Sequence, residues 1–224
     1  MQVWNLYDIL KIRMRIDIYL KLKDLKTTYF SHDELTHTQG RENSEDSIKG
    51  FIKRAIATGH IIRIKRGLYC LNDSLKTGLH HPFVLAQRIY HPSFISLESA
   101  FSFHGLIPEK VETITSMTTL RSNQFKTPLG NFSYASAPAE NFMIGVERIV
   151  DGPHIFMMAT IWRSIADYVY CHKKNWSGFE PLLNSLRMEK EDIPNLTQAQ
   201  FNELNNYYQN NKVAKFLQSC LKEK

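Results

Sequence analysis

Four side chains of the kinds that hydrolases use in catalysis lie close together in this sequence: Ser96, Glu98, Ser99 and His104. A serine can act as nucleophile, a histidine as general base, and a carboxylate can orient the histidine. The chain contains no Gly-x-Ser-x-Gly elbow, however, and such triads assemble in space rather than by adjacency in sequence. The same stretch predicts a short helix, capped by Ser96 and closed by Gly105. We therefore expect a protein that is not an enzyme, with a small hydrolase or nuclease using Glu98 and His104 as an alternative.

The other residues with metal-binding or cofactor-binding chemistry are poorly spaced for it. The pairs His80-His81 and Cys171-His172 are adjacent, which is the wrong spacing for two ligands on one face of a helix or strand. The three cysteines lie too far apart in sequence to form a disulfide framework or a four-ligand zinc site by themselves. The chain contains neither of the two glycine-rich patterns that bind phosphate, Gly-x-x-x-x-Gly-Lys-Ser/Thr and Gly-x-Gly-x-x-Gly. We expect no metal and no cofactor.

The charge distribution points towards nucleic acid as a partner. The 224 residues carry a formal net charge of +6. Residues 1–75 hold 13 Lys and Arg against 9 Asp and Glu, whereas the rest of the chain holds 15 against 13. Clustered basic residues are the electrostatic signature of phosphate binding. The candidate DNA-binding residues are Lys49, Lys53, Arg54, Arg63, Lys65 and Arg66.

These basic residues fall on elements in the order of a winged helix-turn-helix domain, which we expect over residues 1–75. The predicted elements are helices over 5–25, 31–40 and 44–59 and strands over 60–66 and 68–71. The apolar face of the third helix comprises Ile48, Phe51, Ile52, Ala55 and Ile56. In this architecture the third helix enters the major groove and the hairpin touches the DNA backbone. Gly50 costs the third helix about 1 kcal/mol, which makes sense if a neighbour must approach its backbone closely.

An alternative is that the basic side chains of the third helix form only the solvated face of an amphipathic helix. The basic hairpin that follows directly favours DNA over this alternative. Three acidic residues at the start of the helix (Glu42, Glu45 and Asp46) count against DNA. They are compatible with it if they complement the helix dipole, or if one accepts a hydrogen bond from cytosine N4.

Residues 76–224 predict a mixed α+β domain with a helical tail, so the whole chain belongs to the α+β class. Its core candidates include Leu97, Phe101, Leu106, Ile114 and Phe132. The last two predicted helices carry apolar stripes typical of packing faces. No apolar run approaches the ~20 residues of a membrane span, and we expect a cytoplasmic protein without membrane contact.

Several motifs along the chain resemble those of one known family, both in their residues and in the order in which they follow one another. Residues 54–69 contain a basic strand followed by Arg-Gly-Leu-Tyr, and they resemble the end of the N-terminal domain of AbiEi-type antitoxins. The runs 94–108, 114–119 and 127–134 are similar to the start of the C-terminal domain of that family. One departure is Trp162-Arg163, which stands where the family carries an acidic-basic pair before its Asp-x-x-Tyr helix.

The resemblance implies a DNA-binding transcriptional repressor that belongs to a toxin–antitoxin system of the abortive-infection kind. Such a protein would bind double-stranded DNA at inverted repeats in its own promoter. It would also neutralise a nucleotidyltransferase-like toxin without forming a stable complex. The alternative within the binding class is a stand-alone transcription regulator whose second domain senses a ligand or a protein.

The second domain also offers polar and basic residues that we expect to be exposed. They would form either an antitoxin surface or a secondary DNA surface. Polar and basic residues are better suited to transient electrostatic contact than to a stable protein–protein interface. These residues are Ser96, Lys110, Arg121, Lys126, Arg148 and Arg163.

Overall fold

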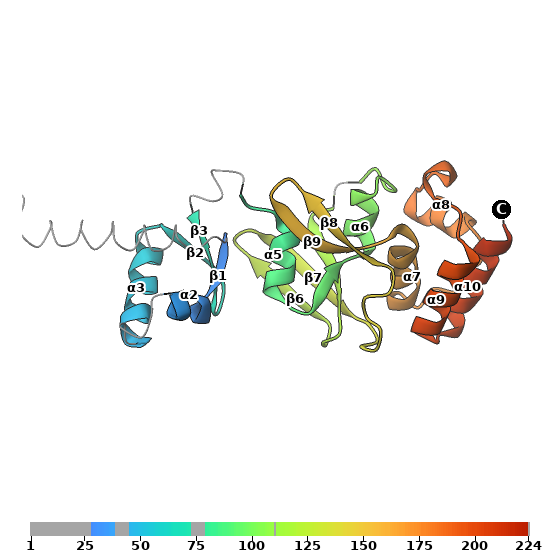
Figure 1. The fold of residues 1–224 in the computed structure, drawn as a ribbon. Helices are drawn as coiled ribbons and strands as arrows, with labels where there is room; N and C mark the ends of the chain where they lie inside the picture. Colours follow the sequence, from blue (N-terminus) through green and yellow to red (C-terminus); the bar gives the residue numbers. More distant parts are fainter. Residues whose placement is uncertain (1–27, 39–44, 73–78, 110, 224) are drawn as a thin grey trace, which may run out of the picture. The chain divides into compact units, whose positions relative to one another are not determined.

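The computed structural model describes residues 28–38, 45–72, 79–109 and 111–223 (Figure 1). The described residues form eight α-helices, one short 3-10 helix and two sheets, which is a mixed α+β fold. They fall into two compact units, residues 1–80 and 81–224, a division slightly later than the expected boundary after residue 75. The helix predicted over 5–25 lies outside the described residues. None of the helices in the described part of the chain has the length and apolar character to cross a membrane.

The first unit contains a three-stranded antiparallel sheet and two described helices. Its elements are β1 (Tyr29–Ser31), α2 (His32–Thr38), α3 (Glu45–Ala57), β2 (Ile61–Lys65) and β3 (Leu68–Leu71). Strand β3 lies between β1 and β2. The predicted hairpin of β2 and β3 is confirmed. Strand β1 was not predicted: the apolar pair Tyr29-Phe30 extends the sheet before helix α2 begins.

Local sequence signals account for the boundaries of these elements. The capping box is confirmed, because Ser31 Oγ accepts from the Glu34 amide at 3.0 Å and Glu34 Oε2 accepts from the Ser31 amide at 2.6 Å. At the hairpin turn, Gly67 has φ +79°, a left-handed conformation that glycine adopts without strain. Strands β2 and β3 are therefore joined by a tight turn.

The core of the first unit packs one face of α3 against the sheet. Phe51 and Ile52 are each 5% exposed, and Ile48 is 1% exposed, in contact with Phe30 and other core residues. Ile56 was expected on the same face, but it is 36% exposed. The prediction was wrong at this residue because Ile56 lies at the edge of the stripe, where the helical period turns it towards solvent.

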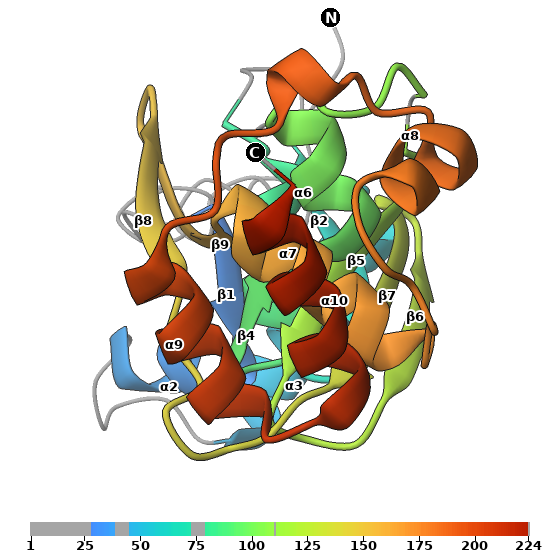
Figure 2. The same cartoon turned by 90° about the vertical axis from the view of Figure 1, so that its right-hand side faces the viewer.

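The second unit is built around a six-stranded mixed sheet of order β6-β7-β5-β4-β9-β8 (Figure 2). Its strands are β4 (Ser93–Ile95), β5 (Thr113–Thr118), β6 (Asn123–Thr127), β7 (Gly130–Ser136), β8 (Val146–Asp151) and β9 (His154–Ala159). Its helical elements are α5 (Pro82–Ile89), α6 (Leu97–Phe103), α7 (Ile161–Cys171), α8 (Glu180–Leu186), η1 (Lys190–Asp192), α9 (Gln198–Tyr208) and α10 (Asn211–Lys222).

Helices cover both faces of this sheet. On one face, the Tyr134 hydroxyl donates to the Ala86 carbonyl of α5 at 2.7 Å. Met117 pairs in register with Ala135, the residue after Tyr134, so its side chain points to the opposite face. There Met117 Sδ lies 3.7 Å from Cys171 Sγ of α7. Helices α9 and α10 then pack on α7, so the tail forms an outer layer (Figure 2).

The predicted packing of the second unit is largely confirmed. The tail stripes are mostly buried: Phe201 and Leu221 are half-buried, and the rest are each at most 5% exposed, namely Leu204, Tyr208, Val213, Phe216, Leu217 and Cys220. Of the core candidates, Leu97, Phe101, Leu106 and Phe132 are buried. Ile114 is only half-buried, so this one prediction does not hold.

Candidate functional site

The basic residues of the first unit lie on the exposed face of α3 and on the β2–β3 hairpin. On α3, the exposed face carries Lys49, Lys53 and Arg54, opposite the buried apolar stripe. On the hairpin, Arg63 and Arg66 are exposed and Lys65 is half-buried. Partial burial lowers the pKa of Lys65 from its ordinary value. All six candidate DNA-binding residues therefore lie on two elements of one unit.

One acidic side chain lies close to this basic surface. Asp46 Oδ1 is 4.0 Å from Lys49 Nζ, one turn away on α3. The Asp46 side chain is 95% exposed and that of Lys49 is 57% exposed, so solvent screens the pair and it contributes little. Phosphate can compete with such a contact. Glu42 lies outside the described residues.

The candidate surface of the second unit is only partly exposed. Arg121, Lys126 and Arg148 are exposed, and Lys110 lies outside the described residues. Ser96 and Arg163, however, are 0% exposed. Their assignment to a surface was wrong, because both turn inward and join a buried polar cluster.

Arg163 and Asp167 form the centre of that cluster. Arg163 Nε lies 3.2 Å from each carboxylate oxygen of Asp167, one turn further along α7. The Arg163 guanidinium also donates to the carbonyls of Phe142 and Ile144, before β8. Its Cζ lies 4.1 Å from the centre of the Tyr207 ring, a cation–π contact. Asp167 thus balances the charge of Arg163, while Arg163 Nη2 is buried without a hydrogen-bond partner.

Asp167 connects α7 to two further parts of the second unit. Its carboxylate accepts from the Ser96 hydroxyl at 2.7 Å and from the hydroxyl of Tyr208 on α9. Burial acts to lower the pKa of Arg163, but Asp167 and the two tyrosines outweigh it and raise the pKa. We call Ser96, Arg163, Asp167, Tyr207 and Tyr208 the Arg163 cluster. It ties α7 to α9 and to the start of α6.

Sequence reasoning missed this cluster, although one signal for it was present. Arg163 and Asp167 are four residues apart, which is the spacing of an ion pair on one helix face. Ser96 was expected to cap α6, but its hydroxyl makes no capping bond and donates to Asp167 instead. The Ser99 amide, in the first turn of α6, donates to Thr115 Oγ1 at 3.0 Å.

The residues of the hydrolase alternative do not come together as a triad. His104 Nε2 lies 2.8 Å from the Ala159 carbonyl oxygen, while the Ser99 hydroxyl accepts from the Thr115 amide at 2.8 Å. Ser96 is bonded to Asp167 without an intervening histidine. Glu98 is half-buried and lines a groove, together with His172. The side chains of Ser96, Ser99 and His104 therefore hydrogen-bond to different groups rather than to one another.

The histidine and cysteine pairs have separate surroundings as well. His81 Nδ1 accepts from the Phe83 amide at 3.2 Å and caps α5, and its Nε2 lies 3.4 Å from Asp151 Oδ2. Burial, followed by the nearby His154, lowers the pKa of His81. Burial and Asp167 raise the pKa of Cys171 to about 12, which makes it a poor nucleophile. Over the part of the chain that the structure describes, no three acidic, histidine or cysteine side chains are grouped to hold a metal ion.

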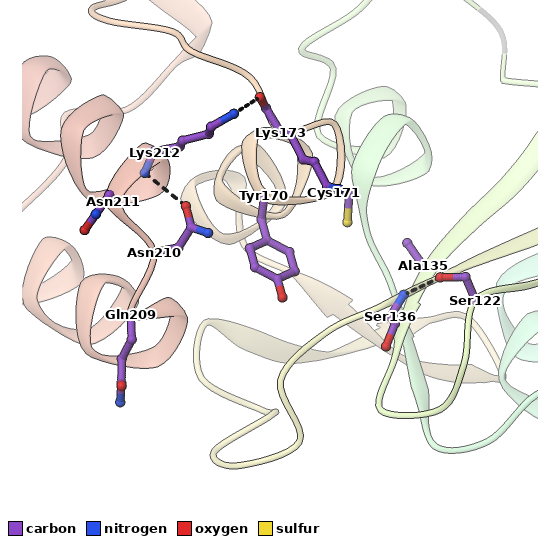
Figure 3. Close-up of a pocket in the computed structure, with 10 residues that line it drawn as sticks. All are labelled: Ser122, Ala135, Ser136, Tyr170, Cys171, Lys173, Gln209, Asn210, Asn211 and Lys212. Carbon is purple, nitrogen blue, oxygen red and sulfur yellow. Dashed lines mark hydrogen bonds between the residues drawn. The ribbon is translucent and has the colours of Figure 1, made fainter.

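A polar groove lies in the second unit beside the end of α7 (Figure 3). Its main pocket has a volume of about 670 Å³, and it shares Ser122, Ala135 and Cys171 with a neighbouring pocket of about 490 Å³. Hydroxyl and amide side chains dominate the lining. Lys212 Nζ donates to the Lys173 carbonyl at 2.9 Å at its rim.

No protein-family model matches the chain, and no curated protein matches it either.

Proposed function

We propose that the first unit is a winged helix-turn-helix domain that binds double-stranded DNA. The observation that carries this proposal is the division of α3 into two faces. One face is buried against a β1-β3-β2 sheet, while the other presents Lys49, Lys53 and Arg54 to solvent. Three more cations lie on the hairpin that follows α3, where a wing contacts phosphate.

The order of the described elements supports this architecture. A strand, two helices and a hairpin follow one another in chain order, with the last strand in the middle of the sheet. In that arrangement α3 is the recognition helix and β2–β3 is the wing.

The whole chain, by its resemblance to AbiEi-type antitoxins, is a repressor of its own operon and neutralises a nucleotidyltransferase-like toxin. Its second unit has its own sheet and a separate core, which supports a division of labour between DNA binding and protection. The role is one of binding rather than catalysis. The dispersed partners of Ser96, Ser99 and His104 favour this view.

The experiment is to measure binding of the full chain to the DNA upstream of its own reading frame. We expect tight, salt-sensitive binding to that duplex and much weaker binding to a shuffled duplex of equal length. Equal affinity for the two duplexes would contradict sequence-specific repression. The second activity is tested by expressing the protein of the adjacent reading frame with and without this chain. Growth arrest that this chain relieves would identify an antitoxin.

The polar groove favours a second candidate function for the second unit. A stand-alone regulator needs a site for its signal, and a pocket of about 670 Å³ has the size of a small-molecule site. If the adjacent reading frame is harmless and a small polar molecule shifts the DNA affinity, this candidate replaces the antitoxin role.

A further inference from the structure

Gly50 lies in the middle of the 13-residue helix α3, where a glycine is costly. It is half-buried and lies on the polar side of the helix, although the nearby residues Ile48 and Phe51 in the sequence are on the buried face. Alanine at an interior helical position is favoured over glycine. No turn or left-handed conformation requires glycine here, because the positive-φ glycines of the described chain lie elsewhere. The residue therefore needs another explanation.

The surroundings of Gly50 identify what its missing side chain leaves room for. A Cβ at this position would lie 3.3 Å from Arg54 Nη1 and 3.9 Å from both Arg54 Cζ and Nη2. These three nearest atoms all belong to one guanidinium group. Position 50 is one helical turn before Arg54, and long side chains on a helix lean back in that direction. The Arg54 guanidinium thus lies over Gly50, close to the helix surface.

This placement puts a planar five-donor group at the centre of the exposed face of α3. Lys49 and Lys53 are exposed on the same helix. Arg54 carries no ion pair with an acidic side chain of the described residues. A lysine contacts phosphate as a point charge, whereas an arginine fork matches the two acceptors of guanine in the major groove. The two lysines are therefore suited to the backbone and Arg54 to a base.

We propose that Arg54 reads a guanine in the operator and that Gly50 is a positioning residue for it. The inference rests on the proposed DNA-binding function and adds the base that is read and the residue pair that reads it. A side chain at position 50 would lift the guanidinium away from the helix and change the depth at which it meets the base edge. A bidentate contact depends on that geometry.

The test is a selection of binding sites from a random duplex library by the full chain. The comparison includes Arg54→Ala, Gly50→Met, the double variant and Ala57→Met. Methionine is a good helix former without hydrogen-bond donors. Ala57 is exposed at the last residue of α3, one turn after Arg54, whereas the Arg54 guanidinium leans back towards Gly50. Ala57→Met thus adds the same side chain to the same helix.

The wild-type chain is expected to prefer a G·C pair at one position by about tenfold or more. Arg54→Ala and Gly50→Met should each reduce that preference to near unity at the same position. Ala57→Met should keep it, and the double variant should behave like Arg54→Ala. Gly50→Met should melt at least as high as the wild type, which separates lost recognition from lost folding.

Three outcomes would contradict these expectations in distinguishable ways. If the wild-type chain enriches no sequence, the proposed function fails and the inference fails with it. If it enriches a motif that Gly50→Met leaves unchanged, only the inference is wrong. Suppose that Arg54→Ala keeps some sequence preference and that Gly50→Met weakens it as much as it weakens that of the wild type. The DNA then approaches the Gly50 backbone itself, and the positioning role is overturned.

Discussion

Arg163 and Asp167 form an ion pair from which solvent is excluded, with both side chains 0% exposed and a nitrogen–oxygen distance of 3.2 Å. The same unit contains an exposed pair of similar chemistry, between Arg187 and Glu109, at 2.7 Å. The two pairs differ in burial and in the further contacts that Arg163 makes with two carbonyls and the Tyr207 ring. They therefore allow a buried ion pair and an exposed one to be compared within one protein.

The first prediction compares these two pairs. Arg163→Met should lower the free energy of unfolding of the second unit by about 3–5 kcal/mol, because it leaves the buried Asp167 charge without a cationic partner. Arg187→Met should cost less than about 1 kcal/mol, since its pair is exposed. Urea unfolding followed by tryptophan fluorescence measures both. Similar losses in the two variants would mean that Asp167 is not dependent on Arg163.

The second prediction concerns alkaline pH. Burial raises the pKa of Tyr207 to about 12 and also raises that of Tyr208. Unfolded tyrosine ionises near pH 10, so above that pH the unfolded chain loses protons that the folded chain retains. Stability is therefore complete below about pH 10 and should fall above it by about 1.4 kcal/mol per pH unit for each such tyrosine. Urea unfolding at a series of pH values gives the slope, which Tyr208→Phe should reduce.

The third prediction concerns the wing. If the hairpin contacts phosphates, log Kd for DNA should change with log salt by about 0.9 per contact. Replacing Lys65 and Arg66 together by alanine should flatten this slope by about two contacts and weaken all sequences alike. Lys215 and Lys222 on α10 are exposed, and their double alanine variant removes the same charge as a control. An unchanged slope in the Lys65/Arg66 variant would remove the hairpin from the DNA interface.

The fourth prediction separates the two units. Phe51→Ala should cost the first unit about 3–5 kcal/mol, enough to abolish DNA binding by a unit this small. Ile56→Ala, on the same helix but 36% exposed, should cost far less. Both variants should still relieve toxicity in the full chain, because the second unit has a separate core. Protection that disappears with Phe51→Ala, while the second unit remains folded, would show that the activities are not separable.

The fifth prediction concerns the exposed cations of the second unit. Arg121→Ala and Lys126→Ala should reduce promoter affinity or protection without lowering the melting temperature, because both side chains are exposed. The tagged protein should not retain a co-expressed toxin at physiological salt, since the exposed candidates are charged rather than apolar. A stoichiometric complex on size exclusion would instead identify an antitoxin that blocks its toxin.

The sequence predicted those elements whose signals are local. Helix α3 and the hairpin followed from apolar periodicity and from a turn glycine, and the capping box at Ser31 followed from residue types three positions apart. Strand β1 was missed because three residues carry too little periodicity, and its pairing with β3 is a contact between distant segments. Ile56 was misplaced because the helical period alone does not give the width of the buried stripe.

The candidate surface of the second unit was harder to predict, because charge alone suggests exposure. Arg163 and Ser96 are polar and were therefore placed at the surface, yet both are buried. Their burial depends on Asp167 and on aromatic rings supplied by α9, which begins 35 positions after Arg163. Only the four-residue spacing of Arg163 and Asp167 was visible locally. Buried polar clusters assembled from distant elements leave this kind of partial signal.

The attachment of α9 to Asp167 has a consequence for the order in which the chain matures on the ribosome. The described elements of the first unit are complete once residue 71 has been made. Asp167 receives its bond from Tyr208 only after the whole of α9 has been translated, because Tyr208 is its last residue. The nascent second unit thus carries an incompletely paired charge through much of its synthesis, and translation that stalls before this tyrosine yields a chain with its first unit built and its second unit unfinished.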